Sequence, residues 1–295
     1  MKLFDLDDVA EESTYGILKN SCKELHIATR VYLENLWVIY EPYADNHFRE
    51  QIRHDFAARF WEMYLACTLI QNNFDIASNN AGPDICLNLN DKKVWIEAIA
   101  PKNTASNSRD FVPYKCPLSG GSAQDEKIIL RFTNAISEKF EKKYESYLKK
   151  KLIGQSDIYV IGINGCQIPS TRIERSPPLI VKTVFPFGQQ KVTYDLKGRV
   201  KPKWSFEYKP LIKKGSGVEI PTTIFINENY KMLSGILYST CDAFNGLEPK
   251  GNDFIFVHNP FALNPLPVGT FKLGREFVPK INGELINISV TTWKI

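Results

Sequence analysis

Three acidic residues stand alone in apolar segments of this chain: Glu62, Asp84 and Glu97. Glu62 lies within residues 60–70, Asp84 follows Pro83 and opens the apolar run 85–89, and Glu97 is embedded in residues 94–101. A carboxylate in an apolar segment is costly unless it is paired, protonated or bound to a metal ion. Each acid alone could instead face solvent, on an edge strand or on the polar side of a helix. Together they indicate a site for a hard divalent cation, Mg²⁺ or Mn²⁺.

The polar break at residues 90–93 predicts a turn between two antiparallel strands. With the turn centred on that break, we expect three pairs: Leu89 with Val94, Cys86 with Glu97, and Asp84 with Ile99. Because positions two apart share a face of a strand, Asp84 and Glu97 would be diagonal neighbours that can share one ion. Magnesium held by one or two carboxylates, waters and phosphate oxygens suits attack on a phosphodiester.

The order of these features resembles the core of the PD-(D/E)XK nuclease superfamily: a helix with Glu62, a strand opened by Pro83-Asp84, and a strand with Glu97. The match spans residues 56–164. The resemblance implies a restriction-endonuclease-like α/β fold, a mixed sheet flanked by helices. It also implies that Asp84, Glu97 and the main-chain carbonyl of Ala98 bind magnesium, with Glu62 completing or orienting the water shell, for hydrolysis of nucleic-acid phosphodiester bonds.

One position departs from the superfamily pattern. Two residues after the Glu, where the pattern has a lysine that positions the attacking water and offsets phosphate charge, this chain has Ile99. The replacement cation could be Lys102, just past the strand, or Lys127 and Arg131, which are four apart and share one face of the next expected helix. We favour Lys127 and Arg131, and Gln124 is a further polar candidate. Alternatively, Ile99 marks a chain that keeps the fold without the chemistry.

The hydrophobic pattern along the sequence predicts that the chain has three parts. Residues 1–55 form an N-terminal helical segment, 56–165 the nuclease-like α/β core, and 166–295 a β-rich C-terminal subdomain or elaboration of the core sheet. Within the core we expect helices at 56–70 and 125–151, a buried strand at 157–164, and a loop between 101 and 122 that lies over the site. The C-terminal strands are expected at 181–184, 192–194, 222–226, 236–238 and 254–258. His258 and Asn259 open a proline-rich segment that we interpret as a rigid surface loop.

The balance of charge permits nucleic-acid binding without requiring it, because the net charge is +4 and the pI about 8.6. We expect contacts from Lys102, Lys201 and Lys203; the last two lie in a segment that mixes basic and aromatic residues, which suits stacking on unpaired bases. The same mixture also occurs on exposed hairpins that protect an edge strand. The lysine-rich run 139–151 is interpreted as a solvated helix face.

Six cysteines without CxxC spacing indicate buried free thiols in a reducing compartment. With no signal-peptide pattern and no long apolar run, we expect a cytoplasmic protein without a membrane span. The sequence therefore predicts a magnesium-dependent endonuclease, with DNA favoured as substrate and a homodimer left open. The alternatives are a catalytically inactive relative that binds nucleic acid or a protein partner, and an interaction protein such as an effector that acts on a host cell.

Overall fold

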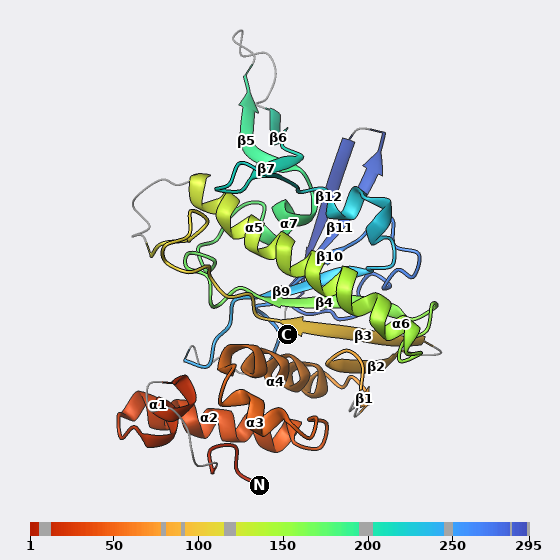
Figure 1. Cartoon of the computed structure of the whole chain (residues 1–295). Coiled ribbons are helices and arrows are strands. Elements are labelled where there is room, and N and C mark those ends of the chain that lie inside the picture. The colour runs from red at the N-terminus through yellow and green to blue at the C-terminus, as the bar shows by residue number, and fades with distance from the viewer. Residues whose placement is uncertain are drawn as a thin grey trace.

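Eight strands form one mixed sheet at the centre of the computed structural model (Figure 1). The structure describes residues 1–5, 13–77, 81–89, 92–114, 122–194, 203–244, 250–283 and 285–293. In spatial order the strands are β1 (Ile76–Ala77), β2 (Ile85–Leu89), β3 (Lys92–Ile99), β4 (Ile158–Asn164), β9 (Gly235–Ser239), β10 (Ile255–His258), β11 (Arg275–Asn282) and β12 (Leu285–Thr292). The pairs β3–β4, β4–β9 and β10–β11 are parallel, and the others are antiparallel.

Helices cover both faces of this sheet, so the predicted α/β class with a mixed sheet flanked by helices is confirmed. On one face lie α1 (Thr14–Asn20), α2 (Glu24–Tyr40), α3 (Phe48–Ile52) and α4 (Phe56–Gln71). On the other lie α7 (Leu179–Val184) and a long helix composed of α5 (Ser122–Glu138), a π-helical stretch η1 (Lys139–Tyr144) and α6 (Glu145–Lys149). Each face has its own apolar core, and β4, which lies between them, is buried along its whole length.

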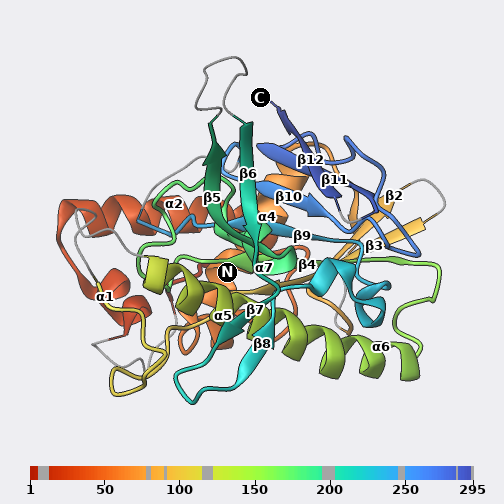
Figure 2. The same ribbon diagram turned by 90° about the horizontal axis from the view of Figure 1, so that it is seen from above.

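Two small sheets and two short helical turns complete the C-terminal half. The hairpin of β5 (Phe187–Thr193) and β6 (Lys203–Tyr208) projects from the body next to β11 and β12 (Figures 1 and 2). Near its base lie β7 (Leu211–Lys213) and β8 (Glu219–Pro221), followed by the 3₁₀ turns η2 (Ile224–Ile226) and η3 (Glu228–Tyr230). Of the strands expected here, those at 236–238 and 254–258 are present as β9 and β10, and β5 contains most of 192–194.

Two expected strands are helical instead. Residues 181–184 belong to α7, and residues 222–226 contain the 3₁₀ turn η2. The β-branched residues of α7 favour strands by propensity, but the helix follows Pro177-Pro178 and buries nearly all of its side chains against α5. Tertiary packing therefore outweighs local propensity at this point. The strand β9 pairs with β4, so the chain after residue 165 continues the core sheet.

Close packing of α4 on β4 fixes the position of the helix that carries Glu62. The indole Nε1 of Trp61 donates to the carbonyl of Gly162 at 3.0 Å. A Cβ at Gly162 would lie 3.1 Å from the Leu65 side chain, tighter than most such contacts, so glycine permits this approach. This contact fixes the distance of α4 from the sheet, and so the position of Glu62 relative to the strands that carry Asp84 and Glu97.

The register of the β2–β3 hairpin differs from the expected one. Cys86 pairs with Trp95 and Leu89 with Lys92, so the predicted partners were wrong by two residues along β3. The reason is that Lys92 and Lys93 belong to the strand, which leaves only positions 90 and 91, both outside the described residues, for the connection. The shift keeps alternation intact and brings Asp84 nearer to the level of Glu97 than the expected pairing would.

Two smaller expectations concern thiols and membranes. Cys67, Cys86 and Cys241 are buried and unpaired, as predicted for free thiols, while Cys22 is exposed and Cys116 lies outside the described residues. Among the helices that the structure describes, none has the length and apolar character needed to span a bilayer.

Candidate functional site

A polar cavity of about 620 Å³ opens between α4, the β2–β3 hairpin and α5. It lies where β3 ends, at the edge of the sheet at which the carboxyl ends of the parallel strands β3, β4 and β9 meet. Ligands of open α/β sheets commonly bind at this edge. Its walls are formed by Asp55, Ala58, Arg59, Glu62, Asp84, Ala98, Ile99, Ala100, Pro101, Lys102, Arg131, Asn134, Ala135, Glu138 and Lys139.

Glu62 enters the cavity from α4 and is buried, with an exposed fraction of 4%. The Tyr40 hydroxyl donates to its Oε1 at 2.5 Å, and the Arg59 guanidinium donates to Oε2. Burial raises the pKa of Glu62 to about 7, although Arg59 and Tyr40 act in the opposite direction. A carboxyl group with this pKa exchanges protons near neutral pH, which is a property useful to a general base.

Asp84 lies at the start of β2, beside β3. The backbone N–H of Ala98 donates to Asp84 Oδ2 at 2.7 Å, which fixes the carboxyl group against the strand. Although the residue keeps some exposed surface, its carboxyl group is closely surrounded; burial, followed by the charges of Glu97 and Glu62, raises its pKa well above the usual value. The negative charges of the two neighbouring acids thus oppose ionisation of Asp84, and nearby positive charge favours it.

Glu97 is buried in β3 and is held by two donors from the helix opposite. Lys139 Nζ donates to Oε1 at 2.6 Å, and the Tyr147 hydroxyl donates to Oε2 at 2.9 Å. Lys139 is the first residue of the π-helical stretch η1, and Tyr147 lies in α6, which follows η1. Such departures from α-helical winding are frequent at functional sites, and this one accompanies the placement of both side chains on a single carboxylate.

The cations expected to replace the missing lysine are only partly at the site. Arg131 and Lys102 both line the cavity; Arg131 Nε donates to the Lys102 carbonyl at 3.0 Å, and Lys102 Nζ lies 3.1 Å from Asp55. Lys127 lies away from the cavity wall, with its Nζ on the carbonyl of Phe111 at 3.1 Å.

Three further expected contacts cannot be placed. The side chains of Gln124 and Lys203 and the whole of Lys201 lie outside what the structure describes.

Lys139 is the functional candidate that the sequence analysis missed. It was assigned to a solvated helix face together with the rest of the run 139–151. Its neighbours Lys142 and Lys149 do form exposed pairs with acids four residues earlier, as that interpretation requires. Lys139 is the first residue of η1, and a π-helical stretch has no strong sequence signal. Arg59, three residues before Glu62, could have been found from its helical spacing.

The donor set suits a divalent cation in part. Asp84 and Glu97 are neighbouring carboxyl groups, and the charge of Glu97 raises the pKa of Asp84. Mg²⁺ requires only one or two carboxylate ligands plus waters. The N–H and C=O of a strand residue point to the same side, so the Ala98 carbonyl is directed toward the Asp84 side of β3. Among the described residues, however, no three His, Cys, Asp or Glu side chains already converge as a complete metal site. Lys139 would have to leave Glu97 for that residue to bind a cation.

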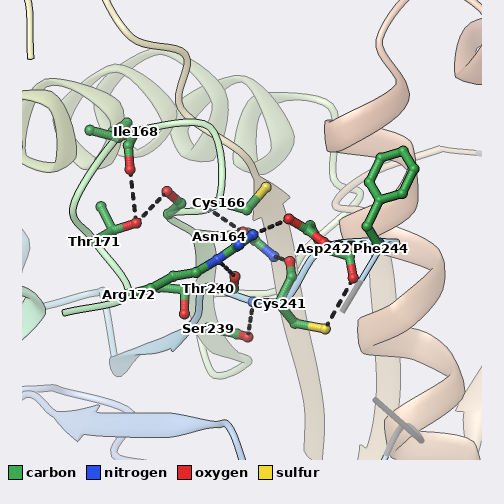
Figure 3. A network of polar contacts seen from close by, with 11 residues as sticks. Asn164, Cys166, Ile168, Thr171, Arg172, Ser239, Thr240, Cys241, Asp242 and Phe244 are labelled. Carbon is green, nitrogen blue, oxygen red and sulfur yellow. Dashed lines mark hydrogen bonds and ion pairs between the residues drawn. The ribbon is translucent and has the colours of Figure 1, made fainter. Parts of the chain in front are cut away.

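Behind the cavity, a polar network ties together the ends of β4 and β9 (Figure 3). Asn164 donates to the Cys241 carbonyl at 2.8 Å and accepts from the Cys166 N–H at 2.7 Å. Arg172 forms an ion pair with Asp242 across the same loops. This network fixes the segment from which Gln167 donates to the carbonyl of Ala100 at 2.7 Å, and so it supports one wall of the cavity.

Another buried acid, Glu276 of β11, lies apart from this cavity and has a structural role. Its carboxylate accepts from the Gly269 N–H at 2.9 Å and the Trp293 indole at 3.1 Å, and lies 2.7 Å from His258 Nε2. His258 and Asn259 are both buried, so the expected surface loop begins inside the protein. The Asn259 side chain donates to two backbone carbonyls, which indicates that this segment fixes a turn and not a substrate.

The fold and the cavity define a mixed α/β protein with three neighbouring carboxyl groups near the carboxyl end of a parallel strand. Comparisons with protein-family models, with curated proteins and with solved structures each found no match to this chain.

Proposed function

We propose that this protein is a metal-dependent endonuclease of restriction-endonuclease-like fold that hydrolyses nucleic-acid phosphodiester bonds, with DNA favoured as the substrate. The observation that carries the proposal is the grouping of Glu62, Asp84 and Glu97 from one helix and two strands: Glu62 and Asp84 line one cavity, and Glu97 is bonded to Lys139 on its wall. Burying three acids within electrostatic reach of each other opposes folding, so a chain that keeps them has a use for them.

Asp84, Glu97 and the Ala98 carbonyl would hold Mg²⁺ or Mn²⁺, and the bound cation would offset negative charge on the scissile phosphate. Glu62, with a pKa of about 7, is suited to take the proton of the attacking water. Its oxygens already accept from Tyr40 and Arg59, but a carboxylate oxygen has a second lone pair for a water molecule.

Lys139 would take the place of the lysine that the superfamily pattern puts at the position of Ile99. Ile99 itself is buried in the apolar core under α5, whereas Lys139 Nζ lies on the carboxylate of Glu97, two residues earlier in β3. When a cation takes its place on Glu97, this lysine would be free to offset the charge that develops on the phosphate in the transition state. Arg131 and Lys102, which line the cavity, would hold the flanking phosphates.

The β5–β6 hairpin is the part of the surface best suited to the nucleic acid outside the cavity. In the sequence, residues 187–209 contain six Lys or Arg and two acids, and the resulting net charge of +4 equals that of the whole chain. The hairpin exposes Trp204 and Tyr208, and Tyr194, which follows β5, is also exposed. Exposed rings beside basic residues suit stacking on bases together with contacts to phosphates.

A catalytically inactive protein of the same fold is the second candidate. It is favoured by the way in which Lys139 and Tyr147 together occupy both oxygens of Glu97. A cluster neutralised by the protein's own donors needs no cation, and Ile99 removes the usual lysine. Such a protein would bind nucleic acid, or a protein partner as an effector does, without dependence on magnesium.

Cleavage assays separate the two candidates. Supercoiled plasmid, single-stranded DNA and RNA are incubated with Mg²⁺ or Mn²⁺, with EDTA, and with the Asp84→Ala variant. Cleavage that requires both the metal and Asp84 is the expected result, and it also identifies the substrate. Lack of cleavage of all three substrates, or equal cleavage by the variant, would refute the nuclease and leave the inactive fold.

A further inference from the structure

The two edges of the central sheet differ in a way that points to an interface. At one edge, β1 has only two residues; at the other, β12 has eight and pairs with β11 at every position without a bulge. An edge strand presents a row of unpaired N–H and C=O groups to which another strand can bind. Proteins usually protect such edges with short strands, charges, prolines or bulges. The edge at β1 is protected by its length.

The edge at β12 has none of these protections. The strand Leu285–Thr292 contains no charged residue, no proline and no glycine. Among the residues that the structure describes, its backbone groups bond only to β11. Leu285 and Val290 are exposed by 69% and 52%. A long, uncharged and β-branched edge of this kind is expected to be covered by another strand.

The two faces of β12 define what can cover it. The even-numbered residues Ile286, Ile288 and Val290 line an apolar groove of about 680 Å³, together with Phe187 and Phe206 from the base of the β5–β6 hairpin. Both views show this hairpin and β12 projecting on the same side of the molecule (Figures 1 and 2). The odd-numbered residues Asn287, Ser289 and Thr291 are polar and exposed, and Leu285, at the start of the strand, is the one apolar residue on this face. A matching strand must therefore alternate in the same way.

We propose that β12 of a second copy of this chain covers this edge, antiparallel to the first and with the two-fold axis at Ser289. Two-fold symmetry is the commonest arrangement in soluble oligomers. If even-numbered positions of one strand pair with even-numbered positions of the other, the apolar side chains of both strands lie on the same face of the sheet. The backbone groups that point away from β11 then also lie opposite each other, so that they can form hydrogen bonds. Pairing about Ser289 sets Ile288 opposite Val290 and Ile286 opposite Thr292.

Charge in the sequence selects this register and this partner. Glu284 precedes the strand and Lys294 follows it, each five positions from Ser289. Ser289 is thus the midpoint between an acid and a base in the sequence, and two antiparallel copies centred on Ser289 bring oppositely charged ends of this segment together. Opposite charges across a strand pair are favourable and like charges are not. The strand is thus complementary to itself, independently of any nuclease activity.

Disulfide cross-linking tests the register. In the Ser289→Cys variant the two new thiols face each other at a separation that a disulfide can span. In the control variant Asn287→Cys, each Cys lies opposite Thr291, so the two thiols are about 13 Å apart and out of reach. We expect a covalent dimer under mild oxidation for Ser289→Cys only. The parental chain controls for the exposed Cys22. Equal cross-linking of both variants, or of neither, would overturn the proposal.

Sedimentation velocity tests the association itself. We expect the parental chain to sediment as a dimer at about 100 µM, and Ser289→Lys, which puts two ammonium groups at the axis, to raise the dissociation constant at least about tenfold. Ser289 is exposed, so circular dichroism should show an unchanged fold. A parental chain that is monomeric at this concentration, or a variant that dimerises equally well, would refute the interface.

Discussion

Two buried glutamates in the same sheet, Glu97 of β3 and Glu276 of β11, differ in their surroundings. Glu276 is a single carboxylate that accepts from a backbone N–H and an indole and lies 2.7 Å from a histidine, and its hydrogen bonds within the described part of the chain involve no second acid. Glu97 shares its neighbourhood with Asp84 and Glu62 and reaches a cavity through the partly exposed Lys139. Burial is common to both; convergence with other acids and access to a cavity belong to Glu97 alone.

An isolated acid in an apolar strand therefore does not by itself indicate a functional site. An acid whose bonding capacity is satisfied by fixed donors cross-links the fold, as Glu276 does for β10, β11 and the residues after β12. Near the cavity, by contrast, the charges of Glu97 and Glu62 raise the pKa of Asp84, so that positive charge is still favourable there. The following substitutions test whether the surroundings of Glu97 and Glu276 correspond to different roles.

The largest effect is expected for Asp84→Asn. This change keeps the shape of the side chain but removes a charge that would hold the cation. Loss of a residue that only orients a metal ligand typically costs up to about 100-fold in activity, so loss of a ligand itself should lower the cleavage rate by more than about 100-fold. Cleavage of plasmid by the folded protein measures it. Glu276→Gln is the matched control and should cleave at nearly the parental rate; a large loss in both variants would erase the contrast.

Lys139→Met should reduce cleavage by about 10²–10³-fold, a range typical for removal of a donor aimed at developing charge. It also leaves the buried Glu97 without its ion-pair partner and lowers the free energy of unfolding. Lys142→Met, on the exposed face of the same helix, is the control and should change neither quantity. Parental cleavage by Lys139→Met would exclude Lys139 as the replacement for the lysine missing at Ile99.

A pH dependence is expected from Glu62, whose pKa is raised from 4.5 to about 7. The folded state then favours the protonated form, so this group's contribution to stability is fully present below pH 4.5 and is lost as the pH rises through about 7. The corresponding free energy is on the order of 3 kcal/mol. Urea unfolding between pH 5 and 8 measures it relative to Glu62→Gln, in which this slope should be absent. An identical slope in both proteins would contradict the shift.

The smallest effect is expected for Glu276→Gln on stability. An amide can accept from Gly269 or Trp293 but cannot provide the charge beside His258, so the free energy of unfolding should fall by about 1–3 kcal/mol. Thermal and urea unfolding measure this loss. A change in the metal dependence of cleavage in this variant would show that the second cluster is not purely structural.

The sequence was informative where chemistry and local pattern coincide. Helix α4, the strands β2 to β4, and the grouping of Glu62, Asp84 and Glu97 follow from solitary acids in apolar runs, and the structure places those acids within reach of one another. The predicted α/β class with a mixed sheet is also confirmed. The register of the hairpin was wrong because the polar Lys92 and Lys93 extend β3.

What could not be predicted depends on contacts between distant segments. Lys139 lies in a lysine-rich run that looks solvated, and only the packing of η1 over β3 shows that it differs from Lys142. The helix α7 overrides the β propensity of its own residues through burial against α5. The role of Glu276 could not be predicted because its three partners, His258, Gly269 and Trp293, come from three separate segments without a distinctive sequence pattern.

A calorimetric titration with Mn²⁺ at pH 8 tests the central claim most directly, because it asks whether the three-acid cluster binds a cation at all. We expect saturable binding to the parental chain and to Glu276→Gln, with loss of binding in Asp84→Asn. Binding should also weaken toward pH 6, since protons must leave Glu62 and Asp84. Absence of binding to the parental chain, or equal binding to Asp84→Asn, would contradict the metal site and favour the inactive fold.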